Sequence, residues 1–182
     1  MSAFEFVFSL YGLLLGLSLA EVLRGLARAL RRRDEVRIGW LTPMLGLFVT
    51  VDLISFWSFA WETRGVLEAS FRVLLFGGLA SGIYYFAATL VFPASPDDWN
   101  DLDDHYRAHR RQVLGAVLVV AVLTYAGSFA LGLRPANLGV SLVYAGIFIA
   151  LMLAAMIVRG RAASAGLLAA LIGMHLFTAL AE

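Results

Sequence analysis

The chain has 182 residues, of which 61% are hydrophobic and only 15% are charged, and its net charge is +1 at neutral pH. Soluble domains are about 45–50% apolar and about 25% charged, so this composition excludes a soluble globular enzyme, a disordered chain and a nucleic-acid-binding protein. A membrane-spanning helix needs about 20 apolar residues, and six such helices would occupy about 120 positions. The composition therefore predicts an all-α integral membrane protein with no room for a separate soluble domain.

Six apolar segments follow one another along the chain, and each has the length that a bilayer requires. The predicted spans cover residues 3–30, 40–62, 68–92, 111–133, 137–158 and 162–181. Ser2 and Glu5 have the spacing of a capping box before the first span, and Thr42-Pro43 are typical N-cap and N1 residues for the second. Short connections make spans two and three, four and five, and five and six antiparallel neighbours. The six spans form a single domain over residues 1–182.

Only the connection between the third and fourth spans is long, and it carries helical signals of its own. Ser95 and Pro96 are typical of an N-cap and a first helical residue. Acidic residues follow and arginines come last, an order that suits the helix dipole. The pattern predicts an interfacial helix over about residues 96–110 that leads into the fourth span. Asp103 and Arg107 are expected to pair on it at i,i+4 spacing.

Asp101, His105 and His109 are spaced four residues apart, so they share one face of the predicted interfacial helix. Carboxylate and imidazole groups at this spacing suit a divalent metal ion. A fourth ligand is missing, however, and a solvated amphipathic face explains the same pattern. We therefore expect no tightly held metal ion and no other cofactor.

The basic residues are all arginine, since the chain contains no lysine, and they gather on one side of the predicted bundle. Eleven of the 14 flank the first, third and fifth connections, and three flank the second and fourth. The positive-inside rule places the arginine-rich connections in the cytoplasm and both termini on the periplasmic side. Arginine in place of lysine, together with abundant alanine and glycine, favours a bacterial inner-membrane protein.

Asp52 is the most informative residue, because it lies near the middle of the second predicted span. A carboxylate at that depth costs at least about 2.5–3.5 kcal/mol, so it needs a partner, a proton or contact with water. At about 100° per residue, Asp52, Ser55, Ser58 and Glu62 fall within one arc of about 120° on this helix. The functional interpretation is a polar path that descends along this stripe. The structural interpretation is a polar clamp that hydrogen-bonds a neighbouring helix.

His175 lies in the sixth span at a depth similar to that of Asp52, because both spans run outward. Tyr11, Tyr125 and Tyr144 fall near the same level. An Asp–His pair can relay a proton or bind a cation. A histidine that donates to a backbone carbonyl within the bundle is the structural alternative.

Glu21 lies at the inner end of the first span, three residues before Arg24 and seven before Arg28. The three side chains are expected to form an ion-paired collar at the cytoplasmic interface. In the functional interpretation Glu21 lies towards the cytoplasmic exit of the Asp52 path. In the structural interpretation the collar is an interfacial pair with snorkelling arginines.

The chain lacks the residues and motifs that several enzyme classes need, so an enzyme is not expected. The chain has no cysteine, no lysine, no Gly-x-Ser-x-Gly elbow and no phosphate-binding glycine loop. Small residues at helical spacing, such as Gly78 and Gly82, favour close contacts between helices.

The leading functional hypothesis is an oligomeric channel or transporter-like protein that passes a cation, a proton or a small solute through the second span. The alternative is a non-catalytic accessory subunit of a larger respiratory or photosynthetic membrane complex. The expected partners are the lipid bilayer and either further copies of the chain or such a complex, and not nucleic acid.

Overall fold

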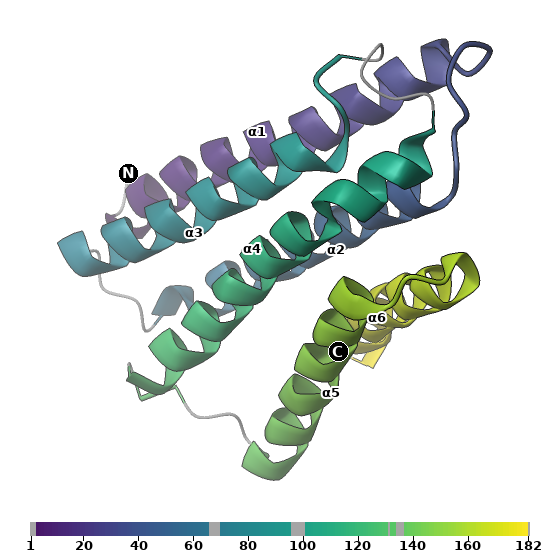
Figure 1. Cartoon of the computed structure of the whole chain (residues 1–182). Helices are drawn as coiled ribbons and strands as arrows, with labels where there is room; N and C mark the ends of the chain where they lie inside the picture. Colours follow the sequence, from purple (N-terminus) through teal and green to yellow (C-terminus); the bar gives the residue numbers. More distant parts are fainter. Residues whose placement is uncertain (1–2, 66–69, 96–100, 131, 134–136, 182) are drawn as a thin grey trace.

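The computed structural model describes residues 3–65, 70–95, 101–130, 132–133 and 137–181 (Figure 1). The α-helices in these ranges are α1 (Ala3–Arg31), α2 (Leu41–Glu62), α3 (Phe71–Val91), α4 (Leu102–Ala130), α5 (Leu138–Ile157) and α6 (Arg161–Ala181). A 3-10 turn, η1 (Thr63–Gly65), follows α2. All six α-helices are long and apolar enough to cross a membrane, which confirms the predicted all-α bundle of six transmembrane helices.

α4 differs most from the predicted bounds, because it is one continuous helix of 29 residues. The segment predicted as an interfacial helix over residues 96–110 forms, from Leu102 onward, the first turns of α4. No proline or glycine occurs between Leu102 and Gly115, so nothing in the sequence separates the two segments. Residues 96–100 lie outside the described ranges, and so does Ser2 with its predicted capping box.

The first turns of α2 and α4 are capped by side chains that the sequence pattern did not predict. At α4 the Asp101 carboxylate accepts a hydrogen bond from the Asp103 N–H at 2.8 Å, as an N-cap does. At α2 the Asp103 Oδ1 atom accepts a hydrogen bond from the Leu41 N–H at 3.0 Å. Thr42, predicted as the N-cap of α2, is already helical, and its hydroxyl donates to the Leu102 carbonyl. A long-range contact thus replaces the local cap.

α2 is the central helix of the bundle and packs against α1, α3, α4 and α6. α1 also packs along α3, α3 along α4, and α5 lies against α4 and α6. Figure 1 shows α1 to α4 running side by side, with α5 and α6 as a pair beside them. The largest fully buried side chains of the core include Leu45, Phe48 and Leu53 of α2, Leu114 of α4 and Leu171 of α6.

The outer faces of the helices are apolar, as the core is. Leu13 of α1 is 62% exposed and Leu79 of α3 is 58% exposed, and large apolar side chains are exposed on the other helices too. A soluble monomer rarely leaves so much contiguous apolar surface in water, whereas lipid acyl chains cover such a surface at no cost. The distribution of apolar side chains therefore agrees with a membrane bundle.

The connections that carry most of the arginines meet at one end of the bundle, which we call the arginine-rich end. α1, α3 and α5 end there, and α2, α4 and α6 begin there. Contacts across it include a hydrogen bond from Arg28 Nη1 to the Ala94 carbonyl at 3.3 Å. Arg37 Nη1 lies 3.8 Å from Asp101 Oδ2 and so links the first connection to the third. The antiparallel order of the helices explains these contacts, because it places the first, third and fifth connections at the same end of the bundle.

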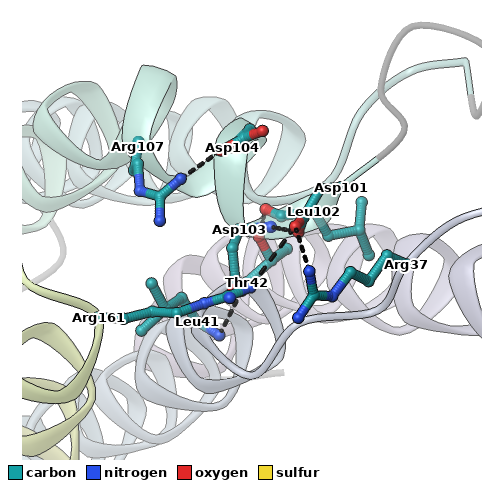
Figure 2. A network of polar contacts seen from close by, with 9 residues as sticks. All are labelled: Arg37, Leu41, Thr42, Asp101, Leu102, Asp103, Asp104, Arg107 and Arg161. Atoms are coloured by element: carbon teal, nitrogen blue, oxygen red, sulfur yellow. Dashed lines mark hydrogen bonds and ion pairs between the residues drawn. The ribbon is translucent and has the colours of Figure 1, made fainter.

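A buried carboxylate joins α2, α4 and α6 at the arginine-rich end (Figure 2). Asp103 is only 1% exposed, and besides the Leu41 N–H it binds the Arg161 guanidinium. Arg107, the predicted partner of Asp103, pairs instead with Asp104. Of the three residues on the predicted solvated face, His105 is not solvated: it is 3% exposed and lies against the Leu90 carbonyl of α3, whereas Asp101 and His109 are partly exposed.

Candidate functional site

The candidate site lies inside the bundle, around the carboxylate near the middle of α2. Asp52 is 6% exposed, although carboxylates are almost never buried without a partner. The sequence places it on the helix that packs against four others, so neighbouring helices can supply its partners.

Two neighbouring helices, α3 and α6, contribute the partners of Asp52. The Tyr84 hydroxyl of α3 donates a hydrogen bond to Asp52 Oδ2 at 2.6 Å. His175 Nε2 of α6 lies 3.0 Å from Asp52 Oδ1. On the other side of the imidazole, Nδ1 lies 3.1 Å from the Ser55 hydroxyl oxygen, one turn along α2. We call these four residues the Asp52 cluster.

The hydrogen bonds of the Asp52 cluster restrict the shared proton to two atoms. Ser55 Oγ donates to the Val51 carbonyl at 3.0 Å, so it accepts a hydrogen bond from His175 Nδ1–H. Nε2 and Oδ1 would repel each other at 3.0 Å if both lacked a proton, so one of them carries it. Nε2 lies close to Oδ1 without the alignment of a regular hydrogen bond, whereas the Tyr84 hydroxyl makes a regular one to Oδ2.

Aromatic rings surround the polar atoms of the cluster. The His175 ring lies 5.6 Å from the ring of Phe148 on α5, edge to face, and 6.1 Å from the ring of Phe48 on α2. The Phe56 ring lies 5.4 Å from that of Tyr84. These apolar walls lower the local dielectric constant, which strengthens the charge interactions inside the cluster.

The comparisons with known proteins assign the chain to no family. No family model matches it, and neither does any curated protein or any solved structure. The function is therefore argued from the geometry of the site.

Two members of the predicted polar stripe lie away from the cluster. Ser58 and Glu62 are exposed, and with Trp57 and Trp61 they line a shallow depression against Phe8 of α1. Ser58 is turned about 120° from Asp52 around the helix axis, so the predicted arc extends from the bundle interior to its surface. Among the described residues the stripe therefore runs from the buried Asp52 through the half-buried Ser55 to the exposed Ser58 and Glu62.

Glu21 forms the predicted collar at the arginine-rich end and does not belong to the Asp52 cluster. Its carboxylate lies 2.9 Å from Arg24 Nη1 and 3.6 Å from Arg28 Nη2. Arg24 remains largely exposed, whereas the Glu21 side chain is 18% exposed. A half-exposed ion pair of this kind contributes little stability, about 0–1 kcal/mol, and a path through Glu21 stays a prediction.

The three residues weighed as metal ligands have other partners. Asp101 caps α4 and pairs with Arg37, and His105 Nε2 lies 3.1 Å from the Leu90 carbonyl. The His109 ring stacks on that of His105 with 4.2 Å between the centroids. Over the described ranges, no three histidine or acidic side chains are arranged to hold a metal ion.

Tyr84 is the member of the cluster that the sequence did not predict. Of the tyrosines expected at this level, Tyr11 donates to the Val73 carbonyl and Tyr125 is 39% exposed. Tyr84 and Tyr85 are adjacent in α3, and only the rotation of that helix about its axis decides which one faces Asp52. One signal was available, because a buried carboxylate requires a donor and tyrosine supplies one at low cost.

We predict that Tyr84→Phe destabilises the protein by about 1–3 kcal/mol, because it removes a donor from a buried carboxylate. In a thermal unfolding experiment in detergent, the midpoint should fall by about 2–12 °C. Tyr85→Phe is the matched control, since Tyr85 is 41% exposed and the same hydroxyl is removed one residue away. Equal midpoints for the two variants would mean that the Tyr84–Asp52 hydrogen bond contributes nothing.

Proposed function

We propose that this membrane protein moves protons, alone or together with a solute, and that Asp52 takes up and releases the proton. The observation that carries the proposal is the 3.0 Å approach of Asp52 Oδ1 and His175 Nε2 inside the bundle. Two ionisable groups at this distance can exchange one proton with little movement. Asp and His pairs within transmembrane helices are typical of proton relays, and carboxylates at this depth are rare without such a use.

The composition of the cluster favours a proton over a metal cation. Hard cations take about six oxygen ligands, supplied largely by carboxylates and carbonyls. The Asp52 cluster offers one carboxylate, of which one oxygen already accepts a hydrogen bond from Tyr84. The remaining polar atoms, the Ser55 hydroxyl and the imidazole, suit proton exchange.

An apolar layer separates the cluster from the arginine-rich end. Leu45, Phe48 and Val49 lie one to two turns before Asp52 on α2, and each is at most 1% exposed. A proton cannot cross such a layer without a rearrangement or the entry of water. The layer therefore favours a gated, transporter-like protein over an open channel.

The proposal includes an assembly of several chains in a bacterial inner membrane, with the arginine-rich end in the cytoplasm. A Cβ atom added at Gly78 or Gly82 of α3 would meet nothing within 4 Å, so this small-residue face is open to a further helix. A second copy of the chain fits this face. A different membrane protein fits it equally, and the accessory-subunit hypothesis rests on the same observation.

The test is proton flux into liposomes that contain the purified protein and a pH-sensitive dye, driven by a potassium diffusion potential. We expect acidification faster than in protein-free liposomes. The same vesicles, loaded with cation-sensitive dyes, measure flux of metal cations. Absence of flux for all ions and potentials would contradict the proposal and favour the accessory-subunit hypothesis. Flux of a metal cation without proton flux would contradict the proposal that the transported ion is a proton.

A further inference from the structure

Arginines from α4 converge on the turn between α5 and α6 at the arginine-rich end. Arg110 donates from Nη1 to the Val158 carbonyl, and Arg111 donates from Nε to the Met156 carbonyl at 3.3 Å. Arg159 lies in the turn itself and is exposed. We call Arg110, Arg111 and Arg159 the turn arginines.

The acidic residues closest in the fold are already paired with other arginines, as Figure 2 shows. Asp103 binds Arg161, Asp104 binds Arg107, and Asp101 lies 3.5 Å from Arg161 and 3.8 Å from Arg37. In the part of the chain that the structure describes, no carboxylate pairs with a turn arginine. Three positive charges therefore meet at one turn, and among the described residues no carboxylate lies within ion-pair distance of them.

The buried member of this group holds the turn in place. Arg110 is 5% exposed, its guanidinium lies 5.8 Å from the centre of the Tyr106 ring, and its Nη1 donates to the Val158 carbonyl. The exposed side chains of Arg111 and Arg159 are therefore the members that a ligand outside the chain can reach. α6 begins at the same turn with no acidic residue in its first turn. Its first N–H groups have no intrahelical acceptor and carry the positive end of the helix dipole, which favours an anion.

An apolar surface continues from this cationic turn along α5. Ile157 is 65% exposed and Leu153 is 45% exposed, and their spacing of four places them on one face of the helix. A ligand that binds here meets positive charge at the helix end and an apolar face along the helix. We propose that Arg111 and Arg159, beside the turn that Arg110 holds, bind the phosphate of an anionic phospholipid whose acyl chains lie along Leu153 and Ile157.

The experiment titrates the purified full chain in detergent with phosphatidylglycerol and follows the midpoint of thermal unfolding. We expect phosphatidylglycerol to raise the midpoint, because a ligand that binds only the folded state stabilises it. Phosphatidylcholine and inorganic phosphate should leave it unchanged. A rise with inorganic phosphate alone would assign the turn to a soluble anion and overturn the lipid proposal, and so would an equal rise with phosphatidylcholine.

The variant that tests the site is Arg111→Gln combined with Arg159→Gln, which leaves the buried Arg110 in place. It should raise the apparent dissociation constant for phosphatidylglycerol about thirtyfold, as expected for losing two interfacial charges. The control is Arg31→Gln with Arg33→Gln, which removes two exposed charges, one at the end of α1 and one in the connection that follows it, at the same end of the bundle. Equal weakening in both double variants would show a general charge effect and would overturn the site.

Discussion

Asp52→Asn should reduce proton flux into liposomes at least about tenfold, while the protein folds and assembles as the parent does. Asparagine keeps the size of the side chain, and its Oδ1 can still accept the hydrogen bond from Tyr84. It cannot take up or release the proton that the proposed relay needs. A loss of one relay group commonly lowers a proton-transfer rate by about 10²–10⁴-fold, so tenfold is a lower bound.

Two further variants of α2 separate transport from packing. Glu62→Gln removes an exposed carboxylate from the same helix, ten residues away from Asp52, and should leave flux unchanged. Asp52→Leu leaves the buried Tyr84 and His175 groups without an acceptor, so it should lower the unfolding free energy by about 1–3 kcal/mol. An Asp52→Asn protein that conducts like the parent would contradict the transport role and leave Asp52 as a polar clamp.

Asp103→Ala should be the most destabilising substitution at the arginine-rich end. The side chain caps α2 through the Leu41 N–H and pairs with Arg161 of α6, so its loss loosens three helices at once. We expect the unfolding free energy to fall by about 1.5–3 kcal/mol, typical of a buried hydrogen bond to a charged group. Chemical or thermal unfolding in detergent measures this change.

The neighbouring acid provides the control for Asp103. Asp104 has a half-exposed side chain and pairs only with Arg107 among the described contacts, so Asp104→Ala should cost less than about 1 kcal/mol. Gly39→Ala should act in the same direction as Asp103→Ala, because a Cβ there would lie 1.9 Å from Asp103 Oδ1. Equal midpoints for the Asp103 and Asp104 variants would contradict the capping role.

The sequence predicted the six helices and most of their bounds because hydrophobic length is a local property. Caps that depend on tertiary contacts could not be predicted in the same way. Thr42-Pro43 has the residue types of a helix start, yet α2 begins at Leu41 because Asp103 of another helix accepts the first N–H. Asp103 in turn has a nearby arginine at i,i+4, and only the packing of α6 against α2 shows that Arg161 is its partner.

The same distinction holds at the candidate site. The depth of Asp52 and His175 follows from the helix order, and the structure does bring these two residues together. Helical periodicity also placed Ser58 and Glu62 on the predicted path, although both are exposed. An arc of about 120° does not specify which of its residues face the core. Tyr84 could not be predicted, because tertiary packing fixes the rotation of α3 relative to α2 and the sequence pattern does not show it.

The most direct test is infrared difference spectroscopy of the protein in liposomes, recorded as the proton gradient is applied and removed. Our account predicts a carboxyl band that appears and disappears with the gradient, that is missing in Asp52→Asn, and that shifts in Tyr84→Phe because Tyr84 donates to this carboxylate. A spectrum of Asp52→Asn identical to that of the parent would show that Asp52 keeps its protonation state during transport, which would contradict the account.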